Sequence, residues 1–140
     1  MNILRGAFVA AAVASMGLLT AGPALADPPL LNGAYNFNSD DGVSGTVTLS
    51  STCAYDGCVA HAVGGRGYVQ GDATLNGGTW TMSVTNPVGD ICVAKDQSFP
   101  ADQVYTFDAV TLRGTVVSTY GPLCDGIPGI TTTGFTLTKA

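Results

Sequence analysis

His61 is the only histidine in this chain of 140 residues, so a Ser-His-Asp arrangement for nucleophilic catalysis would have to use it. No Gly-x-Ser-x-Gly motif of a serine nucleophile lies near it, and its weakly alternating setting is typical of an outward-facing strand residue. The acidic residues that could form a carboxylate pair mostly stand beside glycine, where turn formation already explains them. These are Asp40, Asp41, Asp56 and Asp125. The sequence therefore predicts that the protein is not an enzyme, with a small hydrolase using His61 as the least favoured alternative.

The four cysteines, Cys53, Cys58, Cys92 and Cys124, could form disulfides or hold a metal. Zinc sites with four thiolates usually combine two short cysteine pairs, and this spacing lacks the second pair. An even number of cysteines in a short chain favours two disulfides if the chain folds in an oxidising compartment. Residues 64–67 also lack the Gly-Lys-Ser/Thr ending of a phosphate-binding loop. We therefore expect neither a metal site nor a cofactor.

The first 26 residues have the features of a secretory signal peptide. Arg5 precedes an apolar run at residues 7–19, and the small residues Ala24 and Ala26 mark the expected cleavage site. The run is shorter than the roughly 20 residues of a membrane-spanning helix, although an uncleaved N-terminal anchor is the alternative. Cleavage after Ala26 would leave residues 27–140 as a single domain without a membrane span.

The composition of residues 27–140 limits the partners and the fold. Four Lys and Arg residues stand against ten Asp, a net charge of −6, which disfavours nucleic acid and anionic lipid as partners. Glutamate is absent from the full chain, and its 19 glycines with abundant Thr and Val favour strands and turns over helices. We expect an all-β protein after an N-terminal signal helix.

Residues 75–85 set the pattern of the strands. Trp80, Met82 and Val84 alternate with hydroxyl residues, and Asn76-Gly77-Gly78 before them suits a tight hairpin turn. Similar patterns predict eight strands, at residues 33–37, 43–49, 58–63, 68–75, 79–85, 104–108 and 111–120 and around Phe135 and Leu137, with long loops at residues 86–102 and 121–129. They predict an antiparallel up-and-down meander in a closed or nearly closed barrel, with a two-sheet β-sandwich as the alternative.

The order of the strands in a meander also predicts the disulfides. The loops after the fifth and seventh strands would lie at one end of the barrel, and the loop after the second strand at the other. Of the three pairings that four cysteines allow, we therefore expect Cys53 with Cys58 and Cys92 with Cys124.

Several aromatic residues are expected to point inward. They are Trp80, Phe107, Tyr105, Phe37 and Phe135, together with Tyr35. In an eight-stranded barrel such residues either fill the interior or line a small apolar pocket. We expect a filled core rather than a pocket.

A set of short motifs extends across residues 27–140. The motifs are Cys53-x4-Cys58, Leu75-Asn-Gly-Gly-Thr-Trp80, Cys92, Tyr105-x-Phe-Asp-x3-Leu-x-Gly-Thr115, Cys124 and Phe135-Thr-Leu-Thr-Lys139. Together they resemble a family of small exported all-β, disulfide-containing proteins of mycobacteria and their relatives. They are also similar to extracellular segments of receptor-type Ser/Thr kinases in those bacteria. The resemblance implies the location and the fold, and it transfers no catalytic residue because this family has no established activity.

These observations predict a secreted or cell-envelope protein that acts as a non-enzymatic β-barrel binding or interaction module. Its partner would be a small apolar ligand or a component of the envelope or host. The alternative is a structural or host-facing interaction protein without a ligand pocket.

Mass spectrometry of the protein exported by the organism that encodes it should show Asp27 as the first residue, because cleavage is expected after Ala26. Its mass should be lower by four hydrogens than that of the reduced chain, two for each of the disulfides expected from the four cysteines. Thiols that react without prior reduction would contradict the two-disulfide interpretation, and retention of residues 1–26 would contradict cleavage.

Overall fold

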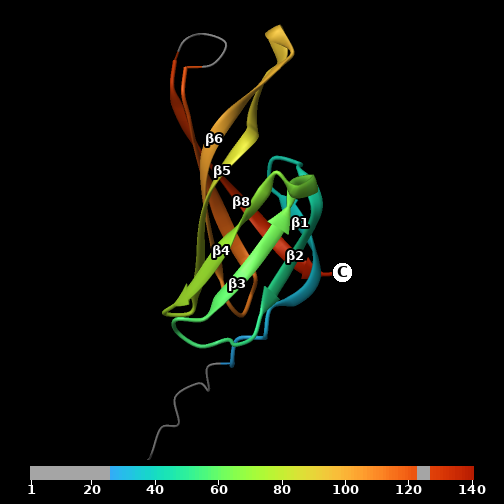
Figure 1. The fold of residues 1–140 in the computed structure, drawn as a ribbon, viewed down its shortest axis with the longest axis vertical. Coiled ribbons are helices and arrows are strands. Elements are labelled where there is room, and N and C mark those ends of the chain that lie inside the picture. The colour runs from blue at the N-terminus through green and yellow to red at the C-terminus, as the bar shows by residue number, and fades with distance from the viewer. Residues whose placement is uncertain (1–25, 123–126) are drawn as a thin grey trace, which may run out of the picture.

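The computed structural model describes residues 26–122 and 127–140. These residues form eight antiparallel strands and two single-turn 3-10 helices, η1 (Gly65–Gly67) and η2 (Val93–Lys95) (Figure 1). The strands are β1 Asn32–Ser39, β2 Ser44–Ser51, β3 Val59–Gly64, β4 Val69–Asn76, β5 Thr79–Cys92, β6 Gln97–Asp108, β7 Arg113–Tyr120 and β8 Gly129–Lys139. The signal helix expected in residues 1–26 lies outside the described residues, apart from Ala26.

Every strand pairs with the next one, and β8 pairs back with β1 to close the barrel. The closing register runs from Tyr35 opposite Lys139 to Ser39 opposite Phe135. The all-β fold and the up-and-down meander are therefore confirmed. Because the hydrogen-bonded ring is complete, the alternative of a two-sheet sandwich is excluded.

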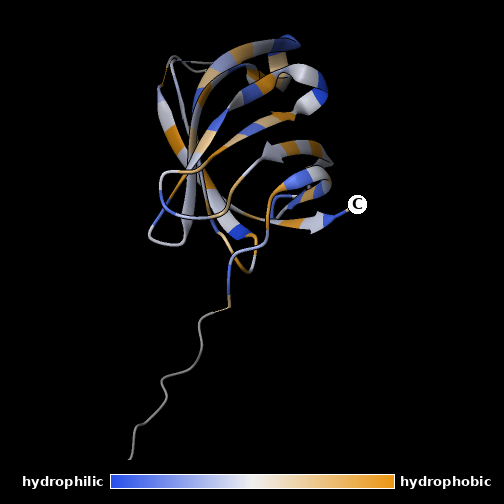
Figure 2. Cartoon of the chain, turned by 60° about the horizontal axis from the view of Figure 1, so that its bottom comes forward, coloured by the Kyte–Doolittle hydropathy of each residue, from blue (hydrophilic) through white to orange (hydrophobic). Residues whose placement is uncertain are grey.

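The turn between β4 and β5 is the tight hairpin that the sequence predicts. Gly77 and Gly78 have φ angles of +56° and +78°, as a two-residue turn with two left-handed positions requires. This turn places Leu75 opposite Trp80, and both side chains are fully buried. Apolar and polar residues alternate along the strands (Figure 2). The burial alternates in the same way in β4 and β5, so one face of the wall is exposed and the other points inward.

One end of the barrel is closed by a loop and by the segment that precedes β1. Cys53 and Cys58 form a disulfide with a Cα–Cα distance of 5.7 Å. Their loop docks on β4, because the Gly57 amide donates to the Leu75 carbonyl and the Leu75 amide donates to the Cys58 carbonyl. The Ser51 amide donates to the carbonyl of the fully buried Leu31. These contacts fix the floor of the barrel.

Cys92 lies buried at the far end of β5. Its expected partner Cys124 belongs to residues 123–126, which lie outside the described residues, as does part of the loop expected at residues 121–129. The pairing of Cys92 with Cys124 therefore stays a prediction.

The prediction of a loop at residues 86–102 is wrong for most of that range. There β5 continues to Cys92 and β6 begins at Gln97, so the two strands form an arm above the ends of β1–β4 (Figure 1). The strand pattern is hidden in the sequence because the register shifts between Asn86 and Asp90 and breaks the two-residue period. Two prolines in the arm also remove donors that a regular strand would have.

Two inward-facing glycines, Gly114 on β7 and Gly45 on β2, allow a matched test of how closely neighbouring strands pack. Gly114 lies between Phe107 and Phe135 in register, and a Cβ there would overlap the Thr106 carbonyl oxygen and lie 2.5 Å from the Phe107 Cβ. A Cβ on Gly45 would meet nothing within 4 Å. We expect Gly114→Ala to lower the free energy of unfolding by about 1–3 kcal/mol or more. Gly45→Ala should leave it unchanged or raise it by less than about 1 kcal/mol.

Urea unfolding of both variants measures the difference. Equal stabilities of the two variants would contradict the close contact between β6 and β7 at Gly114.

Candidate functional site

The interior of the barrel contains a cavity of about 710 Å³ that opens at the end carrying the β5–β6 arm. The expectation of a filled core is therefore wrong for the upper part of the barrel. It holds only at the closed end, where Trp80, Leu31 and Leu75 are fully buried. The mouth is bordered by Ser39 at the end of β1, by Asp41 after it, and by Val88 and Ile91 on the arm.

The cavity exists because one wall of the barrel carries small side chains. Gly45, Ala62, Gly64 and Ala73 face inward from β2, β3 and β4 and line the cavity. The ring of strand pairing fixes the distance between opposite walls, so side chains of this size cannot reach across to the other wall. An eight-stranded barrel is just wide enough either to be filled or to hold one small ligand. Here the small residues on one wall leave space of the size that one small ligand needs.

The structure brings five of the six aromatic residues named from the sequence into one cluster, and Tyr35 is buried outside it. Phe135 is at its centre, with ring centroids 5.0 Å from Phe37, 5.9 Å from Tyr105 and 6.1 Å from Phe107. Trp80 joins through Phe107 at 6.5 Å. Phe37, Tyr105, Phe107 and Phe135 line the cavity, whereas Trp80 is fully buried behind Phe107 and does not line it. The lower part of the cavity is therefore aromatic.

A polar network lies on the cavity wall formed by β5, β6 and β7, and sequence reasoning missed it. Gln103 is buried, its oxygen accepts from the Tyr105 hydroxyl at 2.9 Å and from the Asn86 amide at 3.3 Å, and its nitrogen donates to the Ser118 hydroxyl at 3.1 Å. These four polar residues all line the cavity. The available signal was the alternation in β6, where Gln103 precedes Tyr105 and Phe107 on the inward face.

Two ionisable groups at the site have shifted pKa values. Burial raises the pKa of the Tyr105 hydroxyl to about 12, so this group stays neutral and keeps its proton in the hydrogen bond to Gln103. At the mouth, the Ser39 hydroxyl and then the Val43 backbone amide donate to Asp41 and hold the pKa of that carboxyl below its usual value. The mouth therefore carries a negative charge at neutral pH.

His61 lies outside the cavity, on the outer wall of the barrel. Its Nδ1 is 2.8 Å from a carboxylate oxygen of Asp72, which the register of β3 and β4 places directly opposite. Ser50 is the residue opposite His61 on β2. The side chains of His61 and Asp72 are 56% and 66% exposed, so an ion pair between them contributes little to stability. Asp72 was not named from the sequence, because only the strand register shows that it faces His61.

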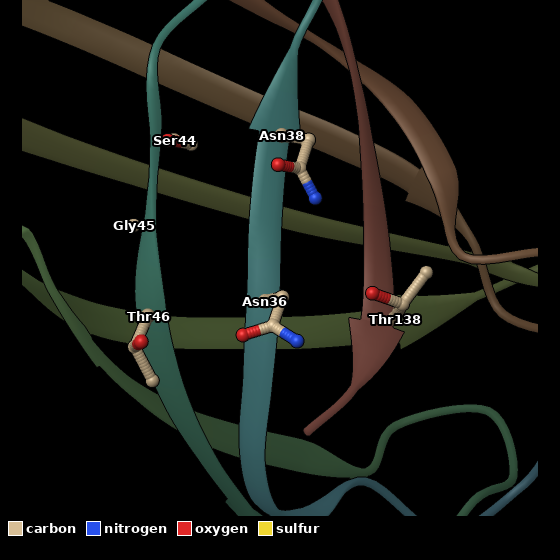
Figure 3. Close-up of a pocket in the computed structure, with 6 residues that line it drawn as sticks. All are labelled: Asn36, Asn38, Ser44, Gly45, Thr46 and Thr138. Atoms are coloured by element: carbon tan, nitrogen blue, oxygen red, sulfur yellow. The ribbon is translucent and has the colours of Figure 1, made fainter.

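A second hollow of about 400 Å³ lies on the outer face of β1, β2 and β8 (Figure 3). Asn36 and Asn38 from β1 lie between Thr46 on β2 and Thr138 on β8 in this view. The hollow is polar and uncharged, and it lacks the apolar floor of the interior cavity. It offers hydrogen-bonding groups to a partner surface, but little area to bury.

Any functional argument has to start from the geometry, because comparisons with known proteins found no match. No protein-family model matches the chain, and searches of curated proteins and of solved structures found no match. Within residues 26–122 and 127–140, no group of three or more His, Cys or Asp side chains is placed to hold a metal ion. In the same ranges no helix is long and apolar enough to cross a membrane. The fold and the cavity define a small closed β-barrel with a disulfide at its closed end.

Titration tests the burial of Tyr105. Its pKa is about 12 in the folded protein against 10.0 ordinarily, so the stabilisation it gives is present below pH 10 and is lost as the pH rises through 12. Between about pH 10 and about pH 11 the free energy of unfolding should fall by about 1 kcal/mol through this group. Urea unfolding of the wild type and of Tyr105→Phe at the two pH values checks this. A fall of the same size in Tyr105→Phe would contradict the assignment.

Proposed function

We propose that this protein is an exported, non-enzymatic β-barrel module that binds a small apolar ligand inside the barrel. The observation that carries the proposal is the cavity of about 710 Å³, which is apolar and aromatic at its floor and open at one end. Pockets for small molecules typically have volumes of about 300–1,000 Å³ and combine apolar walls with a few placed polar groups. This cavity has both features.

The location of the module outside the cytoplasm is supported by the disulfide and by the features of the first 26 residues. The Cys53–Cys58 bond is typical of proteins that fold in an oxidising compartment. The resemblance to small exported proteins of mycobacteria and to extracellular segments of their receptor-type kinases agrees with a secreted or cell-envelope location.

The competing functions have weaker support. A hydrolase using His61 would place its reaction on an exposed outer wall, away from the cavity that could exclude water. A host-facing or structural protein without a ligand would need no hollow interior. The polar hollow around Asn36 and Asn38 is the feature that favours such a surface role.

A neutral fluorescent probe, N-phenyl-naphthylamine, tests ligand binding. Trp80 is the only tryptophan and stacks on Phe107, which lines the cavity, so a probe inside the barrel should quench Trp80 emission by energy transfer. We expect saturable binding by the wild type. Gly45→Phe should weaken it by about tenfold or more, equivalent to about 1.4 kcal/mol, because the new ring occupies the cavity.

Gly45→Ala is the matched control, and it should bind the probe like the wild type because it adds only one carbon in open space. Circular dichroism and urea unfolding of both variants verify the fold. Absence of saturable binding by the folded wild type would refute the ligand-binding proposal. Equal binding by a folded Gly45→Phe variant would place the probe outside the barrel and would also refute it.

A further inference from the structure

We propose that the ligand has an apolar body and an uncharged polar end, such as a hydroxyl or carbonyl group, and that the polar end lies against Gln103, Ser118 and Thr131 near the mouth. This inference rests on the proposed function and names the chemical class that the cavity selects. It is carried by three observations: the row of polar side chains above the aromatic residues, the hydrogen-bonding state of the network, and the charges at the cavity.

The wall formed by β6, β7 and β8 carries a row of polar side chains toward the mouth of the cavity. Thr131, Ser118 and Gln103 follow one another in register across β8, β7 and β6, and all three line the cavity. Below this row, toward the closed end, Tyr105 and Phe135 begin the aromatic floor. A ligand that satisfies both parts must therefore be amphipathic, with its apolar part deepest.

The network leaves specific groups available to such a ligand. The Gln103 oxygen accepts two hydrogen bonds, and its nitrogen donates one of its two protons to Ser118, so one N–H of this amide has no acceptor among the described residues. Ser118 accepts from Gln103, and among the described residues no group receives its hydroxyl proton. The Tyr105 oxygen donates its proton to Gln103 and keeps its lone pairs for an incoming donor. A ligand hydroxyl can accept from Ser118 and also donate, whereas a carboxylate can only accept.

The charges around the cavity disfavour an anionic ligand. No lysine or arginine of the described residues lines the cavity, whereas Asp41 and Asp90 both border its mouth. Moving a carboxylate from water into such a site without a cationic partner costs free energy, and the acidic mouth adds repulsion. A neutral polar end carries neither cost.

Two competitors of equal chain length, decanol and decanoate, test the inference by displacing N-phenyl-naphthylamine from the wild type at neutral pH. We expect decanol to displace the probe at a concentration at least about tenfold lower than decanoate. The reverse order, equal potency, or failure of decanol to displace a bound probe would overturn the inference. In each of those cases the probe still binds inside the barrel, so the proposed function stands.

A charge placed at the mouth provides the matched variant. Thr131→Lys introduces a cation beside Ser118 at an exposed position that lines the cavity. It should strengthen decanoate binding by about tenfold relative to decanol binding. Thr132→Lys adds the same charge at the next exposed residue, which faces outward and pairs with Val117, so it should change neither competitor.

Equal effects of the two lysine variants on decanoate would show that net charge, rather than contact at the polar wall, controls binding, and would overturn the inference. If the wild type itself did not bind the probe, the proposed function would be refuted instead.

Discussion

The closed ring of backbone hydrogen bonds is the constraint on which the rest of this structure depends. Pairing of β8 with β1 leaves no sheet edge and fixes the distance between opposite walls. A sandwich can bring its two sheets together when their side chains are small, but a closed barrel of eight strands cannot contract. Side-chain volume therefore decides, level by level, whether the interior is solid or hollow.

The interior of this barrel is solid at one end and hollow at the other. At the closed end, Trp80 and Leu75 fill the interior, helped by Gly114, whose missing side chain lets Phe107 and the neighbouring backbone come close. The Trp80 indole N–H has no hydrogen-bond partner among the described residues although it is fully buried, which costs about 1–3 kcal/mol. Burial of the large ring has to offset this cost, because the ring fills the closed end of the barrel. Toward the mouth, glycine and alanine on β2–β4 face the aromatic cluster and leave the cavity open.

The strand order, the hairpin at Gly77 and Gly78 and the inward aromatic residues could be read from the sequence, because each depends on a local period or a turn. The cavity could not, because it depends on which inward residues share a level, and this follows from the tilt and stagger of the strands. The β5–β6 arm was hidden for a related reason: a bulge after Asn86 destroys the period on which a strand is recognised. The contact between His61 and Asp72 likewise exists only once the register of β3 and β4 is known.

The cavity has one closed end and one open end, and the arm lies beside the open end. The Cys53–Cys58 loop and the segment at Leu31 block one end, so exchange of a ligand with solvent must occur through the mouth beside the arm. An amphipathic molecule that enters there reaches the aromatic floor with its apolar end and leaves its polar end at the Gln103 network. No ionisable group other than the neutral Tyr105 projects into the cavity below its mouth among the described residues. The groups that such an interior offers are suited to holding and orienting a neutral molecule.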